Sequence, residues 1–101
     1  MIEKLTQVEI QARLSGVSGW ALHEGKLRRT LKFVNFVEAF GFMASVALLA
    51  EKADHHPEWF NVYGTLRIDL TTHEVFGISE RDFGLASAIN REFDRRALPA
   101  S

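Results

Sequence analysis

Apolar residues follow two different spacings along the chain, one typical of helices and the other typical of strands. Spacings of three and four residues, which place apolar side chains on one helical face, occur in three stretches: 5–14, 36–53 and from 80 onward. Apolar and polar residues alternate, or aromatic and apolar residues gather, in four shorter stretches: 20–23, 30–34, 59–63 and 66–71. The pattern therefore predicts helices and strands in the order α-ββ-α-ββ-α.

Capping residues stand where the predicted helices should begin. Thr6 with Glu9, and Asn35 with Glu38, have the spacing of a capping box. Ser79 opens a third cluster whose carboxylates suit the first turn of a helix. Turns that close two hairpins are expected at two places: Glu24-Gly25-Lys26 and Gly64-Thr65.

This order of elements is typical of an α+β fold. We expect a single domain over residues 1–101, with a four-stranded antiparallel sheet covered on one face by helices. The end of the chain, residues 95–101, is expected to fray because chain termini are poorly ordered unless they are tied down.

The helix predicted from Phe36 to Ala53 is apolar nearly all round. One row of apolar residues contains Phe36, Phe40, Met43, Ala47 and Ala50, and another contains Phe42, Val46 and Leu49. A helix of this kind is buried on more than one side, and one small sheet cannot cover it. We therefore favour a subunit interface in a homodimer or homotetramer. The alternative is a wide helix buried within one monomer.

Composition sets limits on the function classes. The chain has 101 residues, of which 47% are hydrophobic and 25% charged, with a formal net charge of -1. Such a balance predicts neither direct nucleic-acid binding nor membrane binding. The absence of cysteine excludes disulfides, thiolate metal sites and cysteine nucleophiles. No signal peptide is evident in residues 1–14, so a cytoplasmic location is expected.

Candidate chemistry gathers where the second predicted helix ends. His55 and His56 are adjacent there, and Pro57 is expected to stop the helix. His73 follows the second hairpin, which can return the chain so that His73 faces His55. Imidazoles titrate near neutral pH, so this set predicts acid–base chemistry, with Glu51 and Asp82 as orienting carboxylates.

Other interpretations of these residues stay open. Histidines near a helix C-terminus are favourable in themselves and need no catalytic role. Three imidazoles can also hold zinc, although no ligand-spaced pair such as His-x-x-x-His fixes two of them together. Trp59 is either a stacking surface for a flat heterocycle or a core tryptophan.

The motifs around these histidines resemble those of the pterin-4a-carbinolamine dehydratases. The resemblance covers most of the chain, from about Trp20 to Ile89, and rests on four segments: Glu51-Lys52-Ala53-Asp54-His55-His56-Pro57-Glu58-Trp59, Asn61-Val62-Tyr63, Thr72-His73-Glu74 and Ser79-Glu80-Arg81-Asp82. It implies a hydro-lyase that dehydrates 4a-hydroxytetrahydrobiopterin to the quinonoid dihydropterin, in tetrahydrobiopterin recycling linked to an aromatic amino-acid hydroxylase. Members of the family need no metal and no bound cofactor.

The resemblance also assigns roles to individual residues. His55 and His73 become the acid and the base, His56 holds the pterin, and Glu51 and Asp82 orient the ligand or the histidines. The remaining pterin-binding positions implied are Pro57, Trp59, Thr72, Glu74 and Val75.

The family includes other functions besides this reaction. Some members serve as dimerisation cofactors of a transcription factor, and the apolar side of the 36–53 helix could bind such a partner. A third possibility is pterin chemistry outside amino-acid hydroxylation, such as molybdopterin metabolism in some bacterial relatives, and the sequence does not separate it from the recycling role. The intact histidine set favours the enzyme, because a pure binding module has no need of it.

Overall fold

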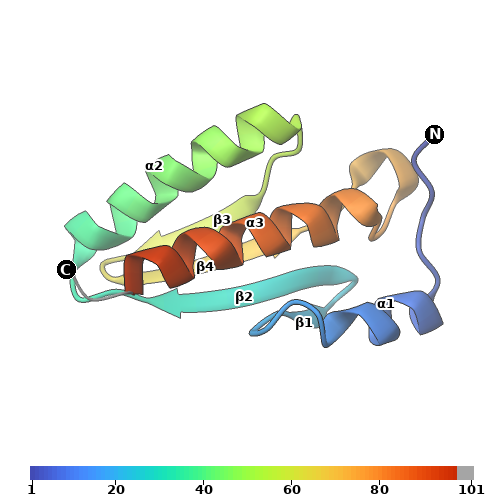
Figure 1. Cartoon of the computed structure of the whole chain (residues 1–101), viewed down its shortest axis with the longest axis horizontal. Helices are drawn as coiled ribbons and strands as arrows, with labels where there is room; N and C mark the ends of the chain where they lie inside the picture. Colours follow the sequence, from blue (N-terminus) through green and yellow to red (C-terminus); the bar gives the residue numbers. More distant parts are fainter. Residues whose placement is uncertain (98–101) are drawn as a thin grey trace.

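The computed structural model describes residues 1–97, which Figure 1 shows from the N-terminus in blue to the end of the last helix in red. Its elements, in chain order, are α1 (Gln7–Leu14), β1 (Ala21–His23), β2 (Lys26–Lys32), α2 (Phe36–Ala53), β3 (Glu58–Val62), β4 (Thr65–Leu70), the short 3-10 helix η1 (His73–Val75) and α3 (Glu80–Ala97). The predicted order of helices and strands is therefore confirmed.

The helix starts follow the predicted caps, with one difference. Thr6 and Glu9 form the full capping box, whereas at α2 only the Asn35 side chain accepts a bond, from the Glu38 amide. At the other end of the chain, α3 continues to Ala97, so fraying from residue 95 is wrong for residues 95–97. Residues 98–101 lie outside the described residues.

The four strands form one antiparallel sheet in the order β1-β2-β4-β3. The β1–β2 turn places Glu24 and Gly25 at positive φ, as tight hairpin turns require. The β3–β4 turn instead needs Gly64 for space, because a Cβ there would lie 2.4 Å from the carbonyl oxygen of Phe33. The β3–β4 hairpin brings the chain back beside the end of α2.

Helices α2 and α3 lie side by side on one face of the sheet, as Figure 1 shows. Between these layers lies one core, to which the sheet contributes Leu27, Leu31, Leu66, Ile68 and Leu70, and the helices Phe42, Val46, Ala50, Leu85, Ala86 and Ile89. Ile10 of α1 joins the same core. The predicted sheet with helices on one face is confirmed.

The two apolar rows of α2 have different surroundings. Phe42 is fully buried and Val46 beside it is buried too, so this row belongs to the core rather than to an interface. The large apolar residues of α2 that stay exposed are Phe36, Val37, Phe40 and Leu48, and we call them the outer face of α2. No helix within residues 1–97 is long and apolar enough to span a membrane.

On the other face of the sheet, an ion pair joins two strands. Arg28 of β2 donates from Nε and Nη2 to the two carboxylate oxygens of Asp69 on β4, at 2.7 and 2.9 Å. These bonds favour the charged form and lower the pKa of Asp69 below its ordinary value. The pair therefore stabilises the fold above about pH 4, where the carboxylate of the unfolded chain is also ionised. That stability is lost as the pH falls through the lower pKa of the folded state.

Asp69→Asn is expected to remove this pH-dependent contribution. At pH 7 the variant should melt at a lower temperature than the wild type, because it loses the charge-assisted bonds to Arg28. Between pH 5 and pH 3 its stability should fall less steeply. Thermal unfolding followed by circular dichroism at pH 7, 5 and 3 measures the two effects, with the exposed Asp94→Asn as control. Equal steepness in the variant and the wild type would contradict the assignment.

Candidate active site

The histidine pair lies in a tight turn between α2 and β3. Helix α2 ends because Asp54 takes the left-handed conformation, with φ 51° and ψ 43°, and its amide donates to Ala50 and Glu51 carbonyls. The His55 amide also donates to the Ala50 carbonyl, at 3.1 Å. The expectation that Pro57 stops the helix is therefore wrong: the turn is complete before Pro57, which leads the chain into β3. This turn directs His55 toward the core.

His55 is held by a carboxylate from the start of α3. Its Nε2 lies 2.7 Å from Oδ1 of Asp82, and only 7% of the His55 side chain is exposed. Asp82 itself is fully buried. Its other oxygen, Oδ2, accepts from the Thr72 hydroxyl at 2.7 Å and from the Ser79 amide at 2.9 Å. The sequence expectation that Asp82 orients a histidine agrees with this geometry.

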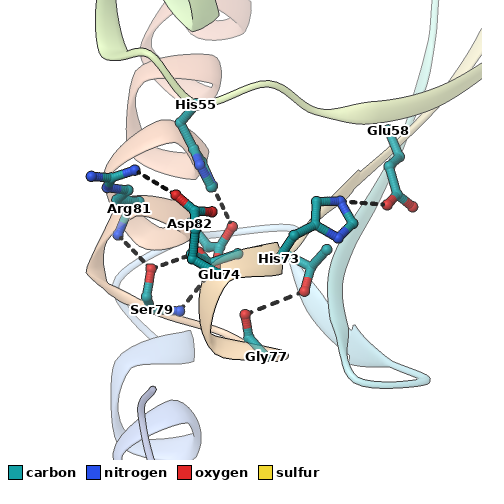
Figure 2. A network of polar contacts seen from close by, with 10 residues as sticks. His55, Glu58, His73, Glu74, Gly77, Ser79, Arg81 and Asp82 are labelled. Atoms are coloured by element: carbon teal, nitrogen blue, oxygen red, sulfur yellow. Dashed lines mark hydrogen bonds and ion pairs between the residues drawn. The ribbon is translucent and has the colours of Figure 1, made fainter. Parts of the chain in front are cut away.

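His73 approaches the same region from η1, and Figure 2 shows it between His55 and Glu58. In contrast to His55, its side chain is 79% exposed. Its Nε2 lies 3.4 Å from Oε2 of Glu58, whose other oxygen accepts from Lys26 Nζ at 2.5 Å. His73 is thus loosely held at the surface, whereas His55 is fixed.

His56 points away from the core, and its Nε2 lies 2.6 Å from Oε1 of Glu51 on the last turns of α2. All three histidines line one open cleft of about 260 Å³. The residues that line this cleft are Asp54, His55, His56, Thr71, His73, Glu74 and Arg81. The structure therefore brings together three imidazoles that are separated by up to 18 positions in the sequence, 73 minus 55.

The predicted site residues fall into three groups around this cleft. His55, His56, His73 and Glu74 line it. Thr72 and Asp82 are buried behind it and bonded to each other, and Asp82 is also bonded to His55, whereas Glu51 is exposed at its rim and bonded to His56. In the part of the chain that the structure describes, Pro57, Trp59 and Val75 do not line it. Trp59 pairs with Ile68 in the sheet, and their side chains point to the helix-covered face.

Sequence reasoning missed Arg81 as a lining residue. Its guanidinium reaches the cleft from the first turn of α3, and Nη1 lies 3.4 Å from Oε2 of Glu74. The sequence shows Arg81 only as part of a helix start, because periodicity does not tell which way a first-turn side chain points. Over residues 1–97, no three histidine or acidic side chains converge in a way that could hold a metal ion.

With this geometry in view, comparison with known proteins identifies the family. A family model described as pterin 4 alpha carbinolamine dehydratase matches residues 3–92. Two relatives, each named "Putative pterin-4-alpha-carbinolamine dehydratase", come from Rhizobium leguminosarum bv. trifolii and Prochlorococcus marinus. The first is 46% identical, covering 96% of this chain and 98% of the relative, and the second is 56% identical, covering 85% and 90%.

A solved structure agrees with these relatives. The crystal structure of a transcriptional coactivator/pterin dehydratase from Brucella melitensis matches with a TM-score of 0.85 and 42% sequence identity. The match covers 89% of this chain and 98% of that one. The motif around the paired histidines, the α-ββ-α-ββ-α fold and these matches lead to one conclusion. The chain belongs to the pterin 4 alpha carbinolamine dehydratase family.

Proposed function

We propose that this protein is a hydro-lyase that dehydrates 4a-hydroxytetrahydrobiopterin to quinonoid dihydrobiopterin. The observation that carries the proposal is the cleft in which His55, His56 and His73 meet. The family and the names of the relatives agree with this reaction. Recycling of tetrahydrobiopterin after an aromatic amino-acid hydroxylase is the pathway that we expect it to serve.

The reaction needs one proton donor and one proton acceptor. The C4a–O bond breaks, its electron pair leaves with oxygen, and an imidazolium supplies the proton that completes water. A neutral imidazole takes the proton from N5, so that the new C4a–N5 double bond gives the quinonoid product. His55 and His73 fill these two roles in our proposal, and exchange them for the two C4a stereoisomers. His56 binds the pterin and takes no part in the proton transfers, which His55 and His73 carry out.

Purified protein is therefore expected to accelerate dehydration of 4a-hydroxytetrahydrobiopterin with no metal added. The assay follows formation of the quinonoid product above the spontaneous rate. In this scheme, acid–base catalysis by positioned histidines accounts for the whole acceleration. The rate of dehydration should therefore be the same with and without a chelator. Activity that disappears with a chelator and returns with zinc would contradict the scheme. No acceleration under any condition would favour a binding function instead.

We further propose that the protein forms a homodimer or homotetramer through the outer face of α2. Four large apolar side chains there are about half exposed or more, with Leu48 at 73%. A monomer rarely leaves so continuous an apolar strip in water. A second copy of the chain offers the same strip and can cover it.

Leu48→Glu should lower the oligomeric state, because the glutamate charge would be buried in the interface between copies. It should not unfold the chain, because position 48 is exposed in the monomer. Sedimentation velocity at micromolar concentration measures this change. Val8→Glu, the same substitution at an exposed residue of α1, is the matched control. Phe42→Glu should instead unfold the protein, since Phe42 is fully buried. A wild type that sediments as a monomer would refute the proposal.

The same outer face supports a second candidate function, binding of another protein. The Brucella melitensis relative is described as a transcriptional coactivator as well as a pterin dehydratase. The apolar side chains Phe36, Phe40 and Leu48 would provide the contact area for such a partner. Variants of the outer face and of the cleft separate the two functions, because only the cleft variants should lose dehydration.

A further inference from the structure

The carboxylate of Asp82 is the end point of a buried hydrogen-bond chain. Besides His55, its partners are the side chain of Thr72 and the backbone of Ser79, and all three residues 72, 79 and 82 have no exposed surface. The hydroxyl oxygens of Thr72 and Ser79 lie 2.6 Å apart. Figure 2 shows Asp82 with Ser79 below it and His55 above it. Thr72 lies between β4 and η1, whereas Ser79 directly precedes α3, so these hydrogen bonds link two parts of the fold.

Counting protons fixes the direction of every bond in this chain. An ionised carboxylate only accepts, so the single hydroxyl proton of Thr72 points to Asp82. The proton between the two hydroxyls must then come from Ser79. Ser79 Oγ in turn accepts from the Arg81 amide at 3.2 Å. All donors therefore point toward Asp82, an arrangement in which each bond polarises the next.

The same counting fixes the tautomer of His55. With Asp82 as a carboxylate, which only accepts, the ring nitrogen that faces it, Nε2, carries a proton. The other nitrogen, Nδ1, has no hydrogen-bond partner within residues 1–97. The only buried side-chain polar atom without a partner in that range is Nε of Arg67, so Nδ1 of His55 reaches open space. His55 lines the cleft, so we infer that Nδ1, the ring nitrogen that does not face Asp82, is the atom it presents there.

We propose that Ser79 and Thr72 are positioning residues, whose hydroxyls hold Asp82 so that His55 keeps its Nε2–H tautomer and offers Nδ1 to the substrate. The catalytic part rests on the proposed function: Nδ1 exchanges one proton with the pterin while Nε2–H stays on Asp82. The tautomer itself is a property of the free protein. Thr72 thus has a role for its side chain, which holds Asp82. This role is separate from the pterin binding that the family resemblance implies for Thr72.

Nitrogen-15 spectra of the histidine rings test the tautomer without any substrate. In the neutral form of the wild type, His55 should show a protonated Nε2 and an unprotonated Nδ1. The signals of His55 are identified as those that disappear from the spectrum of His55→Gln. Thr72→Val and Ser79→Ala should each give a mixture of tautomers, because the Asp82 carboxylate is then held less firmly and can turn away from Nε2 of His55. Thr72→Ser, which keeps the hydroxyl, should restore the wild-type spectrum. A wild type with Nδ1–H, or a Thr72→Val spectrum identical to wild type, would overturn the proposal.

Kinetics provide the second measurement. Ser79→Ala should lower kcat by about 10- to 100-fold with KM nearly unchanged, as expected when a reacting group loses its alignment. Ser79→Thr should recover most of that loss. Ser87→Ala, the same change on α3 outside the cleft, is the control. Normal kcat in Ser79→Ala would overturn the proposal. A wild type without dehydratase activity but with the Nε2–H tautomer would instead overturn the proposed function and leave the positioning role in place.

Discussion

His55→Ala should cost the protein both activity and stability. We expect kcat to fall by a factor of about 10²–10⁴, the usual effect of losing one general acid or base. The free energy of unfolding should also fall, by roughly 1–3 kcal/mol, because Asp82 then keeps a buried carboxylate oxygen without its donor. Steady-state kinetics and urea unfolding measure the two losses separately.

A second substitution separates the two effects of His55→Ala. Adding Asp82→Asn removes the buried charge, so the double variant should regain part of the stability lost in His55→Ala. Its activity should stay low, since no imidazole returns. If His55→Ala leaves stability unchanged, the bond between His55 and Asp82 does not hold in solution. If it leaves kcat unchanged, His55 is not a reacting group.

Local signals in the sequence were sufficient for most of the fold. The bounds of α2 follow from the Asn35 cap and the apolar spacing that ends at Ala53, both of which are read within a few residues. The two hairpins follow from alternation around Gly25 and Gly64. Such signals act between neighbours in the chain, so they can be recognised without knowledge of the tertiary structure.

The faces of α2 could not be predicted in the same way. With apolar residues nearly all round, the spacing does not show whether Phe42 or Phe40 points to the sheet, and only packing decides it. Phe42 is buried and Phe40 is exposed. The position where α2 ends was predicted but the way it ends was not, because Asp54 adopts a left-handed conformation that glycine adopts more readily.

The candidate site was predicted in its residue types but not in its arrangement. His55 and Asp82 are 27 positions apart, and Thr72 reaches Asp82 only because the segment that follows β4 lies beside the start of α3. Spacing cannot give such contacts. It also cannot show that His55 is buried and fixed while His73 is exposed, a contrast that separates their expected responses to substitution.

His73→Ala is expected to lower kcat by a factor of about 10²–10⁴ with little change in KM, because a proton donor or acceptor acts mainly in the transition state. The exposed side chain makes no buried contact, so stability should stay at the wild-type level. This sets His73→Ala apart from His55→Ala, in which both quantities fall. Removal of another exposed histidine, in His23→Ala, is the matched control.

His56→Ala should behave in the opposite way and mainly raise KM. In our proposal His56 holds substrate and transition state about equally, and uniform binding affects KM rather than kcat. Its position agrees with this role, because its Nε2 is engaged by Glu51 at the exposed rim of the cleft. Assays run above and below the KM of the substrate separate the two variants.

Two properties of the substrate shape the His73 and His56 experiment. Spontaneous dehydration must be subtracted, because it can conceal a variant with little remaining activity. Resolved C4a isomers are needed as well, since His55 alone can serve one isomer if the two histidines exchange roles, and His73→Ala would then lose activity on the other isomer only. Intact kcat on both isomers in His73→Ala, with kcat abolished in His56→Ala, would contradict these roles. The adjacent pair at the end of α2 would then carry out both proton transfers.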